Sequence, residues 1–317
     1  MGGEQLEIAL LGAPATLTRE EVVELSGVPL EEARAIWAAL GFPEVPGGEV
    51  AFTERDAAAL QTAIAISRSG LVEPDTLLVL ARSMGQGLAR LAEAQVEVLR
   101  GQAAGLSADE ALGASVSAAQ EVLPGLEQLM VLVWRRQLLA ATERSLATLG
   151  GGHPTLTVAF VDLVGFTQTS RETDAGQLKR LLERFERETS LRVTAAGGRV
   201  IKMLGDEVLF VTADARAAAE VALATVELHE RDETLPQVRA GVPLGPVLAR
   251  LGDVFGEPVN LASRLTTEAR PGTVLVDLHA AEALRGDPAY DLVRLQQRAV
   301  RGYRALRPHV LRRRGAS

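Results

Sequence analysis

The chain has 317 residues, a length that favours two domains, and it contains no cysteine, which excludes disulfide frameworks, thiolate metal sites and cysteine nucleophiles. Its formal net charge of −8 is unevenly spread, since residues 1–150 hold 10 basic and 20 acidic residues and the remainder holds 23 basic and 21 acidic residues. Because affinity for nucleic acid depends largely on neutralising phosphates, the acidic first half argues against binding of DNA or RNA there.

The apolar runs of the chain are short. The longest that mixes aliphatic and aromatic residues, Leu129–Trp134, falls far below the roughly 20 residues that a membrane-spanning helix needs. The N-terminus lacks the basic region and apolar core of a signal peptide. Together with the absence of cysteine, these features predict a soluble, cytoplasmic protein without a membrane span.

The first half of the chain is predicted to be helical. Residues 18–150 are rich in Ala, Leu, Glu, Arg and Gln, and their apolar residues recur at helical spacing. Thr18 precedes acidic residues and is predicted to cap a helix. We expect two long helices, at about 74–100 and about 124–148.

The clearest break in the pattern is the stretch Gly-Gly-Gly-His-Pro, which ends at Pro154. It predicts a helical domain at 1–149, a linker at 150–154 and a second domain at 155–317. In the second domain we expect an α+β fold with a mainly antiparallel sheet and helices on one face. Its elements are predicted as a strand at 155–161, a helix at 174–196, a strand pair at 200–211, a helix at 214–231, a strand pair at 238–251, a helix at 257–269, a strand at 273–277, a short helix at 278–285 and a final strand pair.

Two aspartates stand where predicted strands end. Asp162 follows an apolar strand within Phe-Val-Asp-Leu-Val-Gly-Phe, and Asp206 lies at a tight Gly-Asp turn. Two neighbouring carboxylates in an apolar setting repel each other unless a cation lies between them. Oxygen ligands without histidine suit Mg²⁺ or Mn²⁺. Taken singly, such aspartates are more often loop caps than metal ligands.

Three further positions carry polar groups in unusual settings. Lys202 lies inside an apolar strand, although only 2 of the 33 basic residues are lysines. Asn260 and Arg264 are four residues apart on a predicted helix, so they share one face, a suitable pair for a sugar and a phosphate. For Lys202, the alternative is a strand lysine whose amine simply reaches solvent. For Asn260 and Arg264, it is an ordinary solvated helix face.

These residues, together with Asp253, resemble the catalytic domain of class III nucleotidyl cyclases over about residues 154–312. The resemblance implies a ferredoxin-like βαββαβ domain in which Asp162 and Asp206 are metal ligands. It implies that Lys202 and Asp253 select the purine, and that Asn260 and Arg264 act in the transition state. The backbone carbonyl of Leu163 is a further implied metal ligand, and Arg301 an implied contact for the terminal phosphates.

The activity that the resemblance implies is conversion of ATP to 3′,5′-cyclic AMP and pyrophosphate with two Mg²⁺ or Mn²⁺ ions. A Lys/Asp pair suits adenine, which offers an acceptor at N1 and a donor at N6, and leaves charges mispaired with guanine. In the family, one subunit supplies the metal ligands and its partner supplies the other two pairs, so a homodimer is expected. A catalytically silent nucleotide-sensing module and a guanylyl cyclase are the alternatives.

The N-terminal half resembles a degenerate winged helix-turn-helix of the MerR type, followed by helices similar to the regulatory regions of some actinobacterial cyclases. Since its acidic residues outnumber its basic residues by 20 to 10, we expect it to make protein contacts and to modulate activity. A DNA-binding module under nucleotide control is the competing interpretation. Protons are one candidate signal, because His153 lies in the predicted linker and histidine is the side chain suited to sensing near-neutral pH. An apolar ligand held among the helices is another.

Overall fold

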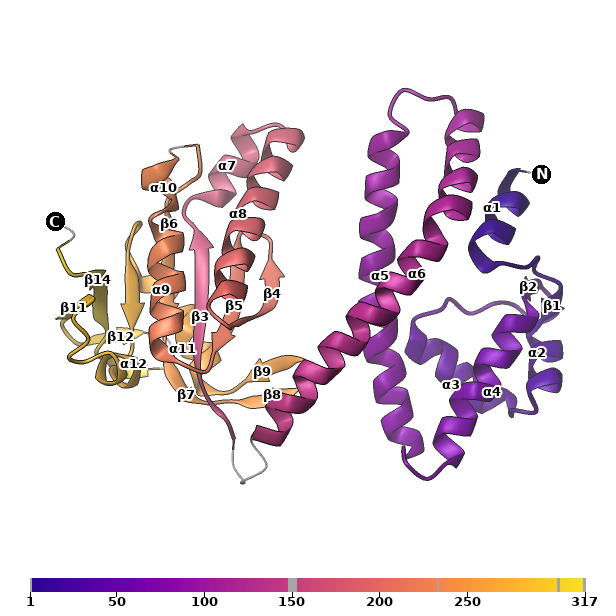
Figure 1. The fold of residues 1–317 in the computed structure, drawn as a ribbon, viewed down its shortest axis with the longest axis horizontal. Helices are drawn as coiled ribbons and strands as arrows, with labels where there is room; N and C mark the ends of the chain where they lie inside the picture. Colours follow the sequence, from indigo (N-terminus) through magenta and orange to yellow (C-terminus); the bar gives the residue numbers. More distant parts are fainter. Residues whose placement is uncertain (1, 148–152, 233, 301–302, 316–317) are drawn as a thin grey trace. The chain divides into compact units, whose positions relative to one another are not determined.

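The computed structural model describes residues 2–147, 153–232, 234–300 and 303–315 (Figure 1). The chain divides into two compact units, Met1–Leu146 and Ala147–Ser317, each with its own hydrophobic core. Residues 150–152 of the predicted linker lie outside the described residues. Over the described ranges, no helix is both long enough and apolar enough to cross a bilayer.

The N-terminal unit is helical apart from one short antiparallel pair of strands, β1 and β2. Its core is built around Val22, Ile36, Leu60 and Ile64, which come from three different helices. The helical character predicted for this half is therefore confirmed. Its elements are α1 (Gly2–Leu11), β1 (Leu17–Thr18), α2 (Arg19–Ser26), α3 (Leu30–Leu40), β2 (Val50–Phe52), α4 (Glu54–Arg68), α5 (Pro74–Gln102) and α6 (Ala108–Ala147).

Reciprocal hydrogen bonds define the starts of two helices. Thr18 caps α2 as predicted, since its hydroxyl accepts from the Glu21 backbone N–H and the Glu21 carboxylate accepts from the Thr18 N–H at 2.7 Å. Ser107 and Glu110 form the same arrangement at the start of α6. The predicted start of this helix near residue 124 is wrong, because α6 begins at Ala108 and continues through Pro124. Pro124 lies inside this helix, where it removes one backbone donor without ending the helix.

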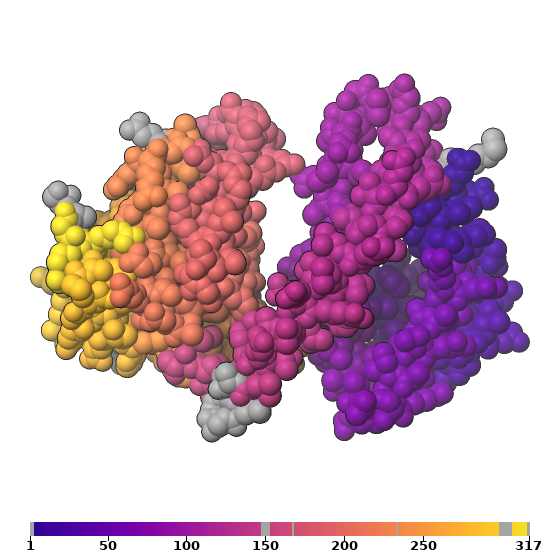
Figure 2. All heavy atoms as spheres, in the orientation of Figure 1, coloured from indigo at the N-terminus to yellow at the C-terminus, as the bar shows by residue number. Residues whose placement is uncertain are grey.

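The surface of α6 is unusually apolar. In the space-filling view this helix lies at the surface of the N-terminal unit (Figure 2). A helix that is apolar on several sides is normally covered by other groups. Its exposed large apolar side chains include Leu129, Val131, Leu132, Val133, Trp134, Leu138 and Leu139.

The C-terminal unit is built on one large sheet with the strand order β11-β14-β10-β6-β3-β5-β4, and β7 pairs with β3. All of these pairs are antiparallel except β10 with β6, which confirms the predicted mainly antiparallel sheet. The strands are β3 (Thr155–Leu163), β4 (Arg199–Leu204), β5 (Glu207–Thr212), β6 (Val238–Val242), β7 (Leu244–Pro246), β8 (Leu248–Arg250), β9 (Asp253–Phe255), β10 (Val274–Val276), β11 (Tyr290–Arg294), β12 (Arg298–Val300), β13 (Tyr303–Leu306) and β14 (His309–Arg313). The helices are α7 (Phe166–Glu172), α8 (Ala175–Ala195), α9 (Ala215–Val226), α10 (Leu228–Arg231), α11 (Glu257–Glu268) and α12 (Leu278–Ala283).

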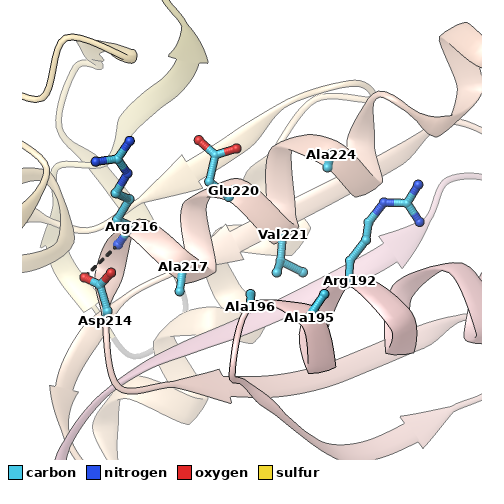
Figure 3. A pocket seen from close by; sticks show the side chains of 9 residues that line it. All are labelled: Arg192, Ala195, Ala196, Asp214, Arg216, Ala217, Glu220, Val221 and Ala224. Carbon is cyan, nitrogen blue, oxygen red and sulfur yellow. Dashed lines mark hydrogen bonds between the residues drawn. The ribbon is translucent and has the colours of Figure 1, made fainter.

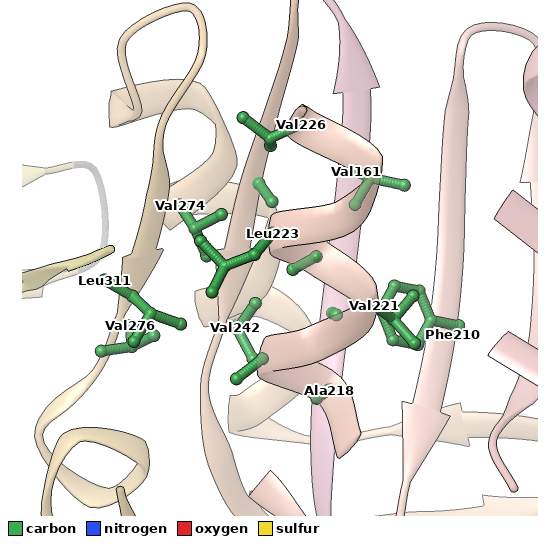
Figure 4. Close-up of a cluster of buried hydrophobic side chains, with 14 of the residues drawn as sticks. Val161, Phe210, Ala218, Val221, Leu223, Val226, Val242, Val274, Val276 and Leu311 are labelled. Atoms are coloured by element: carbon green, nitrogen blue, oxygen red, sulfur yellow. The ribbon is translucent and has the colours of Figure 1, made fainter. Parts of the chain in front are cut away.

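Helices cover both faces of this sheet, so the expectation of helices on one face is wrong. Successive side chains of a strand point to opposite faces. On β3, Val161 belongs to the core cluster under α8 and α9, and Figure 4 shows it beside helix α9. Val158 and Phe160 belong instead to the cluster that includes Ala262 of α11. The almost uninterrupted apolar sequence of β3 follows from burial on both sides.

The close approach of α11 to the sheet depends on a glycine in β6. A Cβ atom at Gly241 would lie 2.4 Å from the carbonyl oxygen of Ala262 and 2.5 Å from the backbone nitrogen of Thr266. The Thr266 hydroxyl, in turn, donates to the carbonyl of Phe160 on β3 at 3.2 Å. The helix that carries Asn260 and Arg264 is therefore seated directly on the backbones of β6 and β3.

Candidate functional site

The two predicted metal-binding aspartates lie at adjacent chain segments. Asp162 is close to the end of β3, and Asp206 occupies the turn between β4 and β5. The Leu163 N–H donates to the backbone carbonyl of Asp206 at 3.1 Å, so the two segments are joined directly. Asp162 is buried, and Asp206 is partly exposed. Burial raises the pKa of Asp162, the Arg239 guanidinium opposes this rise, and the Asp206 carboxylate adds to it.

Arg239 of β6 is a residue of this site that the sequence analysis missed. It is the cross-strand neighbour of Asp162. Its Nε and Nη2 approach Oδ2 of Asp162 at 2.7 and 2.6 Å, and its Nη1 donates to the carbonyl of Thr267 at 3.1 Å. The signal was present, because an arginine inside the apolar strand Val-Arg-Ala-Gly-Val is the same kind of anomaly as Lys202.

A third carboxylate adjoins the two aspartates. Glu207, the first residue of β5, is the other cross-strand neighbour of Asp162. Burial raises the pKa of Glu207, and the charges of Asp162 and Asp206 raise it further. Three carboxylates thus lie near one another, and the Arg239 guanidinium acts on two of them, Asp162 and Glu207. A site with this charge balance favours the arrival of a second cation.

The donor set of this acidic cluster suits a hard divalent cation. Over the described ranges, no three His, Cys, Asp or Glu side chains are arranged to enclose a metal ion. Mg²⁺ is commonly bound by one or two carboxylates while its other ligands are water and substrate phosphates, so the carboxylates of Asp162 and Asp206 fit that ion. The carbonyl of Leu163 is a further oxygen, on a residue that is almost fully buried.

Lys202 and Asp253 form a direct ion pair. Lys202 Nζ lies 2.5 Å from Asp253 Oδ2, although the two residues are 51 positions apart. The other oxygen of Asp253, Oδ1, accepts from the Val254 backbone N–H at 2.8 Å. Both side chains are partly buried, with 39% and 26% of their surface exposed. A ligand can therefore reach the pair from solvent.

Asn260 and Arg264 lie on one face of α11, as their spacing predicts. The buried face of the helix consists of other residues, namely Pro258, Leu261, Ala262, Leu265 and Thr266. Asn260 is exposed and Arg264 is partly exposed. Both side chains therefore remain accessible to a ligand.

The predicted residues fall into separate groups within one chain. As far as the structure describes the chain, no hydrogen bond or ion pair joins the Lys202–Asp253 pair to Asp162 or Asp206. Arg301 lies outside the described residues. His153 is described and is exposed.

A shallow pocket between α8 and α9 is distinct from these groups. It has a volume of about 480 Å³ and an alanine-rich floor with Arg192, Arg216 and Glu220 at its rim (Figure 3). None of the predicted site residues that the structure describes lines it. It lies on the face of the sheet opposite α11.

Comparison with known proteins gives a consistent result. Residues 151–313 match the model of the adenylate and guanylate cyclase catalytic domain. The chain is 37% identical to an adenylate cyclase of Glutamicibacter nicotianae over 96% of its own length and 81% of that protein, and 41% identical to an adenylate cyclase of Streptomyces coelicolor over 88% and 74%. It is also 33% identical, over 89% of its length and 74% of the relative, to a Mycobacterium tuberculosis protein named pH-sensitive adenylate cyclase.

Proposed function

The chain belongs to the family of adenylate and guanylate cyclase catalytic domains, and we propose that it is an adenylate cyclase, which converts ATP to 3′,5′-cyclic AMP and pyrophosphate. The observation that carries the choice of ATP is the Lys202–Asp253 pair. A lysine donates to the N1 acceptor of adenine, and an aspartate accepts from its exocyclic amine. Guanine presents a donor at N1 and an acceptor at O6, so both charged groups would be mispaired with GTP.

The acidic cluster is proposed to hold the divalent cations that this family uses. Asp162, Asp206 and the carbonyl of Leu163 would bind them, and we propose two ions, Mg²⁺ or Mn²⁺, per site. When bound, such ions lower the pKa of the ribose 3′-hydroxyl and neutralise charge on the triphosphate. Arg239 now balances the charge of Asp162, and a cation in this cluster would take over that role and free the guanidinium.

The remaining chemistry is assigned to α11. Asn260 is proposed to orient the ribose so that the 3′-oxygen attacks the α-phosphorus in line with the departing pyrophosphate. Arg264 is proposed to stabilise the charge that grows on the α-phosphate oxygens as phosphorus becomes five-coordinate. The exposed face of the helix supports this assignment, because both side chains are free of the core. Arg301 is proposed as a contact for the terminal phosphates.

The active form is proposed to be a homodimer in which each site combines two chains. One chain would contribute Asp162 and Asp206, and its partner would contribute the purine pair and the α11 pair. Among the described residues of one chain, no hydrogen bond or ion pair joins the two sets of groups, and this supports the arrangement. All six positions are present in the same sequence, so a symmetric dimer would contain two complete sites.

An assay on the purified full-length chain tests the proposed activity. With Mg²⁺ or Mn²⁺, we expect cyclic AMP from ATP at a value of kcat/KM at least about 100-fold above that for cyclic GMP from GTP, because a mispaired buried polar group costs several kcal/mol. Omission of the divalent cation should abolish turnover. Preferential turnover of GTP would identify a guanylyl cyclase, and nucleotide binding without turnover would identify a silent sensor.

The N-terminal unit is proposed to modulate this activity, with pH as the candidate signal. The relative named pH-sensitive adenylate cyclase supports pH over other signals. Because residues 147–317 form a compact unit with their own core, a 153–317 fragment can be compared with the full chain. We expect the two activity–pH profiles to differ in position or steepness. Superimposable profiles at equal dimer concentration would contradict a pH-dependent role for the N-terminal unit.

A further inference from the structure

The hairpin that carries Asp253 is not part of the large sheet. In the described ranges of the chain, strands β8 and β9 pair only with each other, with Leu248 opposite Phe255 and Arg250 opposite Asp253. Lys202, in contrast, lies on β4 at the edge of the large sheet. No strand ladder therefore fixes the distance between the two members of the pair. That distance depends on the side-chain contacts that hold the hairpin against β4.

The turn of this hairpin has an uncommon backbone. Leu251 has φ 51° and Gly252 has φ 82°, so both residues of the two-residue turn are left-handed. This is the geometry that suits the twist of a tight hairpin. In the part of the chain that the structure describes, Leu251 is the one non-glycine residue with positive φ. A leucine in this conformation is strained, because its Cβ approaches the following carbonyl oxygen, so the turn needs contacts that stabilise it.

One such contact comes from the strand that carries Lys202. Arg199, the first residue of β4, donates from Nη1 to the carbonyl oxygen of Gly252 at 2.7 Å. Arg199 is three residues before Lys202, and Gly252 is the residue before Asp253. The apolar side chains next to the pair, Ile201 and Val254, pack into one core cluster. The Arg199 hydrogen bond thus holds the turn of the hairpin against β4, and the apolar cluster holds the hairpin next to the Lys202–Asp253 pair.

Substrate binding requires the contact between the hairpin and β4 to persist while the Lys202–Asp253 ion pair opens. In the structure Lys202 and Asp253 are in contact with each other at 2.5 Å. In the proposed function, on which this inference rests, an adenine accepts from Lys202 and donates to Asp253, so the contact between the two side chains must open. Asp253 then loses its cationic partner and keeps the Val254 N–H. The carboxylate stays in place for the exocyclic amine only if the backbone before it is held.

We propose that Arg199 is a positioning residue for purine selection, which fixes the Gly252–Asp253 peptide against β4 so that Asp253 accepts from the adenine amine while Lys202 donates to N1. It does not touch the nucleotide itself. Its loss leaves Lys202 and Asp253 in the chain and removes the fixed spacing between them. The consequence is weaker discrimination between adenine and guanine, with the phosphate and metal contacts unchanged.

The test compares full-length wild type with Arg199→Ala, Arg199→Lys and Arg250→Ala. Arg250 lies on the same hairpin, and within the described ranges its exposed side chain makes no hydrogen bond or ion pair, so it is the matched control. For Arg199→Ala we expect the ATP-over-GTP ratio of kcat/KM to fall by about fivefold to tenfold, the effect of one lost hydrogen bond to a positioned group. The loss should appear mainly in KM for ATP. Arg199→Lys should recover part of the ratio, and Arg250→Ala should leave it unchanged.

Equilibrium binding of 3′-deoxy-ATP and 3′-deoxy-GTP, which lack the attacking hydroxyl, provides a second readout that does not depend on turnover. The Kd for 3′-deoxy-ATP should rise in Arg199→Ala, and that for 3′-deoxy-GTP should not. Absence of cyclase activity in wild type would contradict the proposed function alone. An unchanged adenine-over-guanine ratio in Arg199→Ala, in either turnover or binding, would overturn the role of Arg199. If Arg199→Ala does not fold, the ATP-over-GTP ratio of Arg199→Lys decides. An Arg199→Lys ratio equal to the ratios of wild type and Arg250→Ala would overturn the role of Arg199.

Discussion

An Asp162→Asn chain and a Lys202→Ala chain, each inactive alone, are expected to regain cyclase activity when they are coexpressed. Asp162 belongs to the acidic cluster with Asp206 and Glu207, whereas Lys202 is paired with Asp253. If each site combines these groups from two chains, a mixed dimer contains one site with both defects and one site with neither. Each single variant should lose activity by on the order of 100-fold or more, because Asp162→Asn removes a proposed metal ligand and Lys202→Ala removes the proposed donor to adenine N1.

The size of the recovery follows from the symmetry of the dimer. Random pairing of equal amounts makes half of the dimers mixed, and half of the sites in those dimers are intact, so about one quarter of the wild-type activity is expected. Differently tagged chains allow the mixed dimer to be purified, and its activity should then approach about half of wild type.

The matched control is a mixture of Asp162→Asn with Asp206→Asn. Both changes lie in the acidic cluster, so every site in a mixed dimer keeps one defect and no recovery is expected. No recovery in the Asp162→Asn and Lys202→Ala mixture, with mixed dimers demonstrated, would contradict the shared site. Equal recovery in the control mixture would show that restoration has another cause.

Gly241→Ala is expected to have the second largest effect, although residue 241 is buried and reaches no ligand. The added Cβ would lie 2.4 Å from the Ala262 carbonyl oxygen and 2.5 Å from the Thr266 nitrogen. Both are backbone atoms of α11, so no side-chain rotation relieves the contact and the helix must move. Overpacking of this kind costs about 1–3 kcal/mol of stability.

Movement of α11 displaces the two side chains that are assigned to the reaction. A shift of about 1 Å in a positioning group costs on the order of 100-fold in rate. We therefore expect kcat of Gly241→Ala to fall by about that factor, with a lower Tm and a smaller change in KM. Far- and near-ultraviolet circular dichroism would establish that the variant is folded before kinetics are measured.

Gly87→Ala is the control for this substitution. Gly87 lies in α5, and a Cβ atom there would meet nothing within 4 Å. The same chemical change should therefore leave kcat unchanged and slightly raise stability, because alanine is the better helix former. Wild-type kcat in a folded Gly241→Ala chain would contradict this prediction. It would show that Asn260 and Arg264 act without the close packing of α11 on Gly241.

Local sequence alone determined much of this protein. The apolar runs predicted β3 and the β4–β5 pair, the helical periodicity predicted α5 and α8, and Thr18 predicted the start of α2. These features depend on residues within a few positions of one another. The family resemblance likewise rested on short motifs, and the match of residues 151–313 agrees with it.

Tertiary structure decided what depends on contacts between distant residues. Arg239 is 77 positions from Asp162, and Arg199 is 53 positions from Gly252, so no local pattern shows that these arginines balance a carboxylate and hold a turn. Packing between distant residues also places helices on both faces of the sheet and brings α11 close to Gly241. Hydrophobic pattern and hydrogen-bonded caps act along the chain, whereas charge pairing and close packing act through space, and only the fold brings their partners together.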